Sequence, residues 1–155
     1  MENIFFYETI IGLLGIKENG TNITEIYFGK DEIPNNMEPK ETPLIKEAMN
    51  QLEEYFEGKR KSFDLPFEAK GTEFQRSVWN ELLKIPYGET CSYGEIAKRI
   101  GNPKGSRAIG MANNRNPISI VIPCHRVIGA SGKLVGYGGG LDIKEKLLNL
   151  EKENL

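Results

Sequence analysis

The chain has 155 residues and a mass of 17.4 kDa, which is enough for one ordinary domain or two small ones. Apolar residues make up 39% of it and charged residues 27%, a composition that supports a core and argues against wholesale disorder. Two cysteines exclude a disulfide scaffold, and a single histidine without CxxC or HxxxH spacing argues against a structural zinc site.

The first apolar stretch, Ile10 to Ile16, is about a third of the length needed to cross a bilayer. Glu2 and Glu8 precede it where a secretion signal carries lysines, and no small-residue cleavage site follows. We therefore expect no membrane association and a cytoplasmic protein with reduced thiols.

The net charge of -2 conceals two halves of opposite sign. Residues 1–66 hold 7 basic against 13 acidic residues, and residues 67–155 hold 13 against 9, so the balances are -6 and +4. No acidic residue lies between Glu95 and Asp142. Seven basic residues fall in that interval: Lys98, Arg99, Lys104, Arg107, Arg115, Arg126 and Lys133. This segregation indicates either a surface that faces a polyanion or a solvated basic face without a ligand.

The beginning of the chain predicts a small antiparallel sheet. Residues 3–16 are largely apolar, Asn19 and Gly20 mark a turn, and residues 23–28 alternate apolar with polar side chains. A helix follows, with Thr42 as its N-cap, Pro43 in its first position and Gly58 as its stop. Its apolar face carries Leu44, Ala48, Leu52, Tyr55 and Phe56.

The second half begins with helices. Thr72 caps a segment that bears Val78 and Trp79, and Ser92 and Glu95 fit a capping box at the start of the next helix. A turn at residues 101–103 leads to a further helix, which Asn102 or Ser106 opens and which runs to about Asn113. Two short helices across a tight glycine turn predict a helix-turn-helix, although many helical hairpins bind nothing.

The second of these helices is rich in small residues. Ala108, Gly110 and Ala112 permit close approach of another surface, and Arg107 is the one long side chain near the start. The pattern suits a helix packed tightly on its own core, and it equally suits a reader of the DNA minor groove that inserts one arginine.

The only histidine directly follows a cysteine. Residues 118–122 predict a short buried strand, Pro123 ends it, and Cys124 and His125 come next. A thiol beside a base suggests a nucleophile, whereas a buried inert cysteine at a strand end is the commoner case. Residues 129–140 contain six glycines but neither a phosphate-binding loop nor a dinucleotide fingerprint, and a helix follows over residues 141–153.

Four further motifs accompany this pair. Residues 123–128 read Pro-Cys-His-Arg-Val-Ile, with Asn116-Pro117 before them and Gly-Tyr-Gly-Gly-Gly-Leu at 136–141 after them. Together with residues 71–79 and 85–90, they resemble in order and spacing the O6-alkylguanine-DNA alkyltransferases, also called methylated-DNA-protein-cysteine methyltransferases. The resemblance covers roughly residues 67–151.

The resemblance implies an α+β fold: a small N-terminal antiparallel sheet with a helix, ribonuclease H-like, over residues 1–66, and a mainly helical domain with a winged helix-turn-helix over residues 67–155. It also implies direct reversal of DNA damage. In this reaction an alkyl group passes irreversibly from O6 of guanine, or from O4 of thymine, to the protein. The implied partner is double-stranded DNA bound through its minor groove by a monomer. No cofactor or metal is implied.

The resemblance also assigns roles to residues. Cys124 accepts the alkyl group, His125 takes its proton through a bound water, and Glu151 orients His125. Tyr93 protonates the departing base, and Arg107 enters the base stack where the target nucleotide has rotated out. The other residues assigned to DNA contact are Ser92, Lys104, Ala108, Gly110 and Ala112. Those assigned to the substrate pocket are Asn116, Ser119, Val127, Tyr137 and Gly138.

Two positions depart from the family pattern. Ser119 stands where some members have proline, and Gly138 stands where a serine often occurs. These departures argue against a preference for bulky alkyl groups but not against methyl transfer. Three alternatives remain at this stage: an alkyltransferase-like binding module, which lacks an acceptor cysteine, a regulator that reads the major groove, and a thiol hydrolase that turns over many times. We interpret Cys91 as structural.

Overall fold

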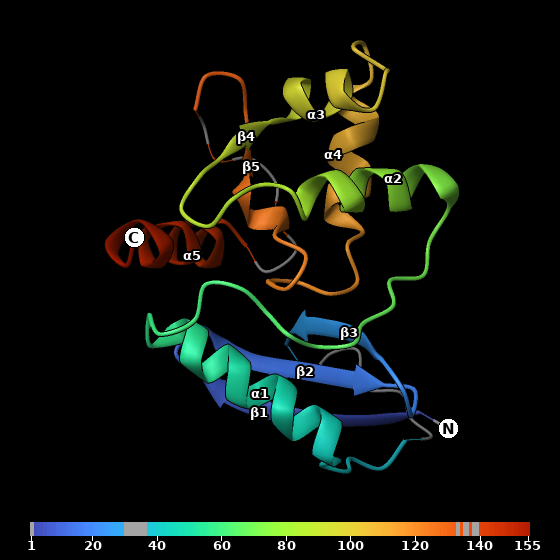
Figure 1. The fold of residues 1–155 in the computed structure, drawn as a ribbon, viewed down its shortest axis with the longest axis vertical. Coiled ribbons are helices and arrows are strands. Elements are labelled where there is room, and N and C mark those ends of the chain that lie inside the picture. Colours follow the sequence, from blue (N-terminus) through green and yellow to red (C-terminus); the bar gives the residue numbers. More distant parts are fainter. Residues whose placement is uncertain (1, 30–36, 133, 135–136, 138–139) are drawn as a thin grey trace.

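The computed structural model describes residues 2–29, 37–132, 134, 137 and 140–155, and it stacks a sheet layer beneath a helical layer (Figure 1). The lower layer is a three-stranded antiparallel sheet covered on one side by a single helix. The strands are β1 (Asn3–Thr9), β2 (Gly12–Glu18) and β3 (Ile23–Phe28), and they lie in the order β1-β2-β3. The helix that covers them is α1 (Pro43–Phe56). The predicted sheet and helix are therefore confirmed.

Local sequence explains where these elements begin and end. Gly12 has a φ of +105° in the turn between β1 and β2, and the Asn19 side chain accepts backbone hydrogen bonds in the turn between β2 and β3. The Thr42 hydroxyl accepts from the N–H of Ile45 at the start of α1, and Gly58 adopts a φ of +76° just after its end.

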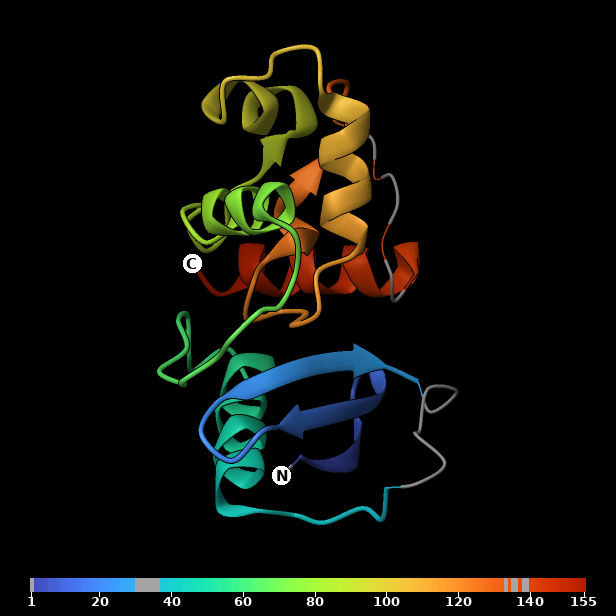
Figure 2. The ribbon, with the colours of Figure 1, turned by 90° about the vertical axis from the view of Figure 1, so that its right-hand side faces the viewer.

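Among the described residues, the upper layer contains four α-helices. Figure 2 shows this layer above the sheet. The helices are α2 (Glu73–Leu82), α3 (Tyr93–Arg99), α4 (Ser106–Asn114) and α5 (Leu141–Glu153). Thr72 and Gln75 form the capping box of α2, and Gly101, with a φ of +79°, lies in the turn between α3 and α4. The predicted helix-turn-helix is thus present as α3 and α4.

One predicted helix cap needs correction. Ser92 does accept the N–H of Glu95, but the Glu95 carboxylate accepts from the Cys91 thiol and pairs with Arg99 at the other end of α3. Only one half of the expected capping box therefore forms. α4 begins at Ser106, one of the two expected residues, and its N-cap is Gly105, which has no side chain to contribute.

The strand predicted over residues 118–122 is wrong. The chain reverses there: Ser119 bridges to Ile122, and Ile120 holds a positive φ of 74°. Positive φ strains a β-branched residue, so the surrounding packing must enforce it. The run is apolar because it is wedged between the two layers, and periodicity alone does not separate that case from a buried strand.

This reversal is hydrogen-bonded to β3, an edge strand of the sheet. β3 bridges in parallel to the segment before Cys124 and to the connector between the layers. The backbone bonds are Ile26 N–H to Pro117 O at 2.9 Å, Ser119 N–H to Ile26 O at 3.0 Å, Ile23 N–H to Pro66 O at 2.9 Å, and Glu68 N–H to Ile23 O at 2.9 Å. The N-terminal sheet therefore positions the chain that leads into the cysteine.

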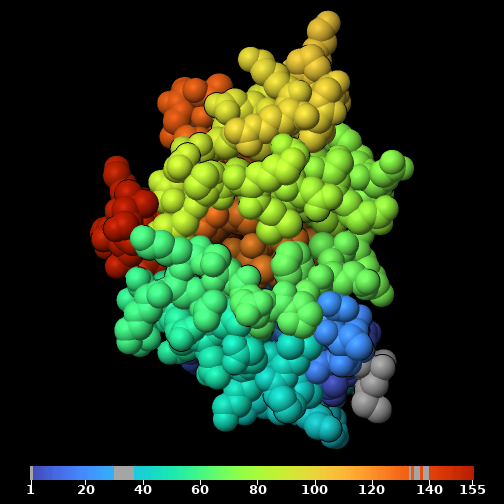
Figure 3. Space-filling view, in the orientation of Figure 1, coloured from blue at the N-terminus to red at the C-terminus, as the bar shows by residue number. Residues whose placement is uncertain are grey.

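The two layers share one hydrophobic core, and the space-filling view shows them in broad contact (Figure 3). After the reversal, a short 3₁₀ helix η1 (Cys124–Arg126) leads into β5 (Val127–Ile128), which pairs in parallel with β4 (Cys91–Ser92). Within the part of the chain that the structure describes, no helix combines the length and apolarity needed to span a membrane.

Candidate active site

Cys124 opens η1 directly after the reversal and is 5% exposed. Burial raises the pKa of its thiol to about 11, even though hydrogen bonding to Asn116 and the charge of Lys144 act in the opposite direction. The residue lies on the wall of a cavity of about 420 Å³, together with Asn116 and Ser119. The thiol is thus protonated at neutral pH but accessible from a cavity.

His125 is fully buried and turns its ring toward α5. Its Nε2 lies 2.6 Å from Oε2 of Glu151, while Nδ1 has no hydrogen-bond partner among the described residues. An ionised carboxylate accepts only, so Nε2 carries the proton of the neutral ring and Nδ1 is the free base. Burial lowers the pKa of His125 against the opposing effect of Glu151, which keeps the ring neutral and able to accept a proton.

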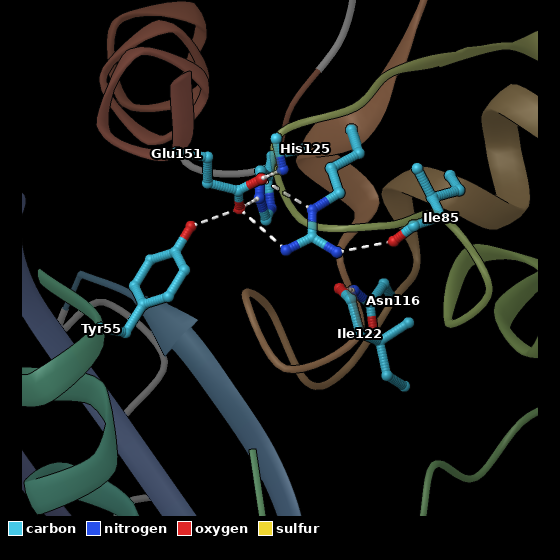
Figure 4. A network of polar contacts seen from close by, with 8 residues as sticks. Tyr55, Ile85, Asn116, Ile122, His125 and Glu151 are labelled. Carbon is cyan, nitrogen blue, oxygen red and sulfur yellow. Dashed lines mark hydrogen bonds and ion pairs between the residues drawn. The ribbon is translucent and has the colours of Figure 1, made fainter. Parts of the chain in front are cut away.

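Glu151 is the centre of the polar network, and Figure 4 shows Tyr55 and His125 converging on it. Among the described residues, five groups bond its carboxylate: His125 Nε2, Tyr55 OH at 2.6 Å, Gly88 N–H at 3.0 Å, and Arg126 Nε and Nη2 at 2.8 and 3.0 Å. Burial alone would raise the pKa of Glu151, but His125 and Arg126 outweigh it and lower that pKa to about 2. The carboxylate therefore stays ionised.

Arg126 belongs to this network and not to a basic surface. It is 7% exposed, and its Nη1 donates to the carbonyl of Ile85 at 2.7 Å. Its guanidinium also lies 5.7 Å from the ring centre of Tyr87. Arg126 therefore does not contribute to the basic surface expected for residues 96–141, because its charge is neutralised inside the protein. Lys133 in the same interval lies outside the described residues.

Sequence reasoning missed Lys144, which is fully buried in α5. Its Nζ donates to the carbonyl of Val127 at 2.6 Å and lies 6.0 Å from the ring centre of Tyr93. Burial lowers its pKa to about 8, although Cys124 acts in the opposite direction. A signal did exist, because Lys144, Leu147 and Glu151 follow the spacing of one buried helix face.

Tyr93 begins α3 and is half-buried near Cys124. Burial and Cys124 raise the pKa of its phenol, and a hydrogen bond with the Asn113 side chain acts in the opposite direction. Tyr93 also lies on the wall of a second cavity, of about 510 Å³, together with Arg107 and Gly110. Asn114 lines both cavities, so they are neighbours. Tyr93 therefore connects the helix-turn-helix to the cysteine.

The residues expected to contact DNA are divided between surface and interior. Arg107, Ala108 and Lys104 are exposed, and Gly110 is partly buried with the Tyr93 ring 3.7 Å from where a Cβ would stand. Ala112 is 3% exposed, and its carbonyl accepts from the indole of Trp79 on α2. The expectation for Ala112 is wrong, since α4 turns this residue toward the core. Ser92 is partly buried and caps α3.

The predicted pocket residues also differ in their placement. Asn116 donates to the carbonyl of Ile122 at 2.8 Å and accepts from the N–H of Ile118 at 3.0 Å, so it holds the reversal together. Val127 is fully buried, and its carbonyl is taken by Lys144.

Tyr137 packs its ring 5.8 Å from that of Phe28 in β3. Burial and Cys124 raise the pKa of its phenol, which places this side chain beside the thiol. Tyr137 thus joins the sheet layer to the cavity at Cys124. Gly138 lies outside the described residues.

Comparison with known proteins identifies the family. Residues 5–69 match the ribonuclease-like domain, and residues 73–153 the DNA binding domain, of 6-O-methylguanine DNA methyltransferase. The chain belongs to this methyltransferase family. A methylated-DNA--protein-cysteine methyltransferase of Methanosarcina acetivorans is 58% identical over 94% of this chain and 95% of its own, and a constitutive one of Bacillus subtilis is 48% identical over 94% and 92%.

Solved structures of other methyltransferases of the family have the same fold. The O6-methylguanine methyltransferase of Mycobacterium tuberculosis superposes with a TM-score of 0.92 at 44% identity, covering 100% of this chain and 95% of that one. A structure of the M. tuberculosis OGT in complex with DNA gives 0.91 at 46% identity over 98% and 94%. The matched DNA binding domain contains Cys124, His125 and Glu151, and the matched ribonuclease-like domain contains Tyr55.

Proposed function

We propose that this methyltransferase repairs double-stranded DNA by moving one alkyl group from O6 of guanine, or O4 of thymine, onto Sγ of Cys124. The observation that carries this proposal is a buried thiol followed directly in η1 by a histidine whose Nε2 is held by an ionised Glu151 and whose Nδ1 has no hydrogen-bond partner among the described residues. Family membership supplies the reaction type, and these side chains supply its chemistry.

The transfer starts with removal of the thiol proton. Because the pKa of Cys124 is about 11, the proton must leave during the reaction, and Nδ1 of His125 is the acceptor, through a bound water. The sulfur electron pair then forms the S–C bond, the C–O6 bond breaks, and the purine takes up the negative charge. Glu151 stabilises the imidazolium that His125 becomes.

The departing base needs a proton, and Tyr93 is the donor in this proposal because its phenol lies near Cys124. The phenol hydrogen passes to the purine, and the imidazolium of His125 returns a proton to the phenolate, so charges and atoms balance. The buried ammonium of Lys144, beside the Tyr93 ring, favours the negative charges that arise on sulfur and on the phenolate. The product thioether has no good leaving group, so the protein is consumed.

Access to O6 requires the base to leave the stack, because this atom is paired inside a duplex. Exposed Arg107 and Ala108, with the slim Gly110, make α4 suited to the minor groove, where Arg107 fills the space that the rotated nucleotide leaves. The M. tuberculosis relative seen with DNA supports DNA as the partner. We propose that one monomer acts on each lesion, in the cytoplasm, where the free thiols of Cys91 and Cys124 remain reduced.

Intact-mass and peptide-mass measurement after incubation with O6-methylguanine duplex DNA tests this function. We expect one added methyl group per protein, on the peptide that contains Cys124, and none on Cys91, which is an internal control thiol. Cys124→Ser should bind the same DNA without reacting. Multiple turnovers, or methylation mainly at Cys91, would contradict the proposal, and strong preference for one undamaged sequence would indicate a regulator instead.

A further inference from the structure

Tyr55 brings the N-terminal layer into the catalytic network. It lies in α1, 96 residues before Glu151, and its hydroxyl donates to Oε2 of Glu151 at 2.6 Å. The same oxygen receives Nε2 of His125, also at 2.6 Å (Figure 4). Tyr55 is fully buried, so this hydrogen bond does not compete with bulk water.

The ring of Tyr55 is held in place by other aromatic side chains. Its neighbours are Phe56, Phe63 and Tyr87, with ring centres 5.8, 5.6 and 6.2 Å away. These contacts fix the direction in which the hydroxyl points, and loss of the hydroxyl alone would leave them intact. The hydrogen bond is therefore a property of the fold and separable from the packing.

We propose that Tyr55 is a positioning residue that sets the basicity of His125 through Glu151. The N-terminal layer thereby contributes to the relay, by which we mean Glu151 and His125 acting on the thiol of Cys124. The proposal rests on the proposed function for its biological meaning. The physical coupling between Tyr55 and His125 follows from the geometry, because both bond to Oε2 of Glu151.

The direction of the effect follows from the charge on that oxygen. A hydrogen bond from Tyr55 withdraws part of the carboxylate charge that would otherwise stabilise the imidazolium of His125. Without this hydroxyl, Arg126 and the N–H of Gly88 still hold Glu151 in position, because they supply three of its five bonds. The stabilising effect on the imidazolium then increases, and the pKa of His125 rises.

The other charged groups around His125 keep their places in this comparison. Arg126, next in η1, and Lys144, from α5, both lower the pKa of His125, whereas Glu151 raises it. Tyr87, from the segment between α2 and β4, faces Glu151 and Arg126. Since Tyr55→Phe alters none of them, a change in the His125 titration reports on the Tyr55 hydroxyl.

The experiment uses the full chain with 15N-labelled histidine, because His125 is the only histidine and gives one set of ring signals. The pKa of His125 is measured by NMR in wild type, in Tyr55→Phe and in Tyr7→Phe. Tyr7 is the matched control, since its hydroxyl donates to the Glu41 carboxylate at 2.5 Å, outside the relay. We expect a raised pKa for His125 in Tyr55→Phe and an unchanged one in Tyr7→Phe.

Single-turnover methyl transfer between pH 5 and 9 gives a second readout. Only neutral His125 accepts the thiol proton, so Tyr55→Phe should transfer about three- to tenfold more slowly at the acid end and at the wild-type rate on the plateau. Replacement of Tyr55 by 3-fluorotyrosine, whose more acidic hydroxyl donates more strongly, should move the pKa of His125 in the opposite direction. This second variant retains the ring packing if the phenylalanine variant does not fold.

The outcomes separate the two proposals. If the pKa of His125 were unchanged in both Tyr55 variants and only the free energy of unfolding fell, the proposed role of Tyr55 would be overturned. Tyr55 would then serve only to stabilise the fold. A wild-type protein that transfers no methyl group to Cys124 would overturn the proposed function, while the NMR titration would still decide whether Tyr55 acts on His125.

Discussion

Glu151→Gln removes the charge on which the catalytic network is built while preserving the shape of the side chain. In the variant, an NH₂ group replaces one carboxylate oxygen and meets donors from Arg126, His125, Tyr55 or Gly88, depending on which way the amide points. Donors then face donors in a fully buried site. Removing one partner of a buried ion pair costs about 3 to 5 kcal/mol, which for a chain of this size lowers Tm by about 6 to 20 °C.

The pKa of Glu151 gives an independent magnitude and a pH window. A value of about 2, against an ordinary 4.5, corresponds to about 3 kcal/mol of stability carried by the ionised form. Because the pKa is lower in the folded state, this stability is complete above about pH 4.5 and is lost as pH falls toward 2. The gap in unfolding free energy between wild type and Glu151→Gln should therefore shrink over that window.

Urea unfolding at a series of pH values measures both quantities. Glu153→Gln is the control, because Glu153 is exposed on the same helix and its substitution should change stability by less than about 0.5 kcal/mol. His125, whose pKa is lowered by burial, also loses stability on acidification, but that loss begins below its ordinary pKa of 6.5. A cost below 1 kcal/mol at pH 7, or a gap independent of pH, would refute this account of the network.

Three further predictions concern the reaction. Arg107→Ala should slow repair of duplex DNA far more than reaction with the free alkylated base, and equal losses would place Arg107 in the chemistry or the fold. Tyr93→Phe should keep DNA affinity and lower the single-turnover rate by about ten- to a thousandfold, so an unchanged rate would remove Tyr93 from the mechanism. The transfer rate of the wild type should fall as pH rises above about 8, where Lys144 loses its charge. Lys144→Met should transfer about tenfold or more slowly and should show no such fall in rate at alkaline pH. If Lys144→Met showed the same fall, the titrating group would be one other than Lys144.

Elements signalled by local chemistry could be predicted from the sequence. Thr42 and Thr72 are found as N-caps, because a hydroxyl that accepts a free backbone N–H depends only on the residues beside it. The last helix begins at Leu141 and ends at Glu153, as predicted. The pairing of His125 with Glu151 came from resemblance to a family, since nothing local joins residues 26 positions apart.

Features that depend on long-range packing could not be predicted. The reversal at Ile120 forms because the segment is hydrogen-bonded to β3 and buried between the two layers. The residues themselves favour a strand. Arg126 looks like a surface charge in the sequence, because arginine is seldom buried unless paired. For Lys144, only its spacing with Leu147 and Glu151 indicates a buried helix face. The contact between Tyr55 and Glu151 could not be predicted either, because the spacing of apolar residues marks Tyr55 only as part of a buried helix face.

The burial of Cys124 decides how its proton is handled. With a pKa of about 11, only about one thiol in ten thousand is ionised at pH 7, against a few per cent for an ordinary cysteine. A ready-made thiolate therefore does not account for the transfer, and proton removal has to accompany it. In the proposed mechanism, neutral His125 accepts that proton at Nδ1, and the ionised carboxylate of Glu151 already lies beside the His125 ring to stabilise the resulting imidazolium. In the proposed mechanism, a buried and protonated Cys124 is therefore slow to react with other electrophiles, and it is activated when an alkylated base lies between His125 and Tyr93.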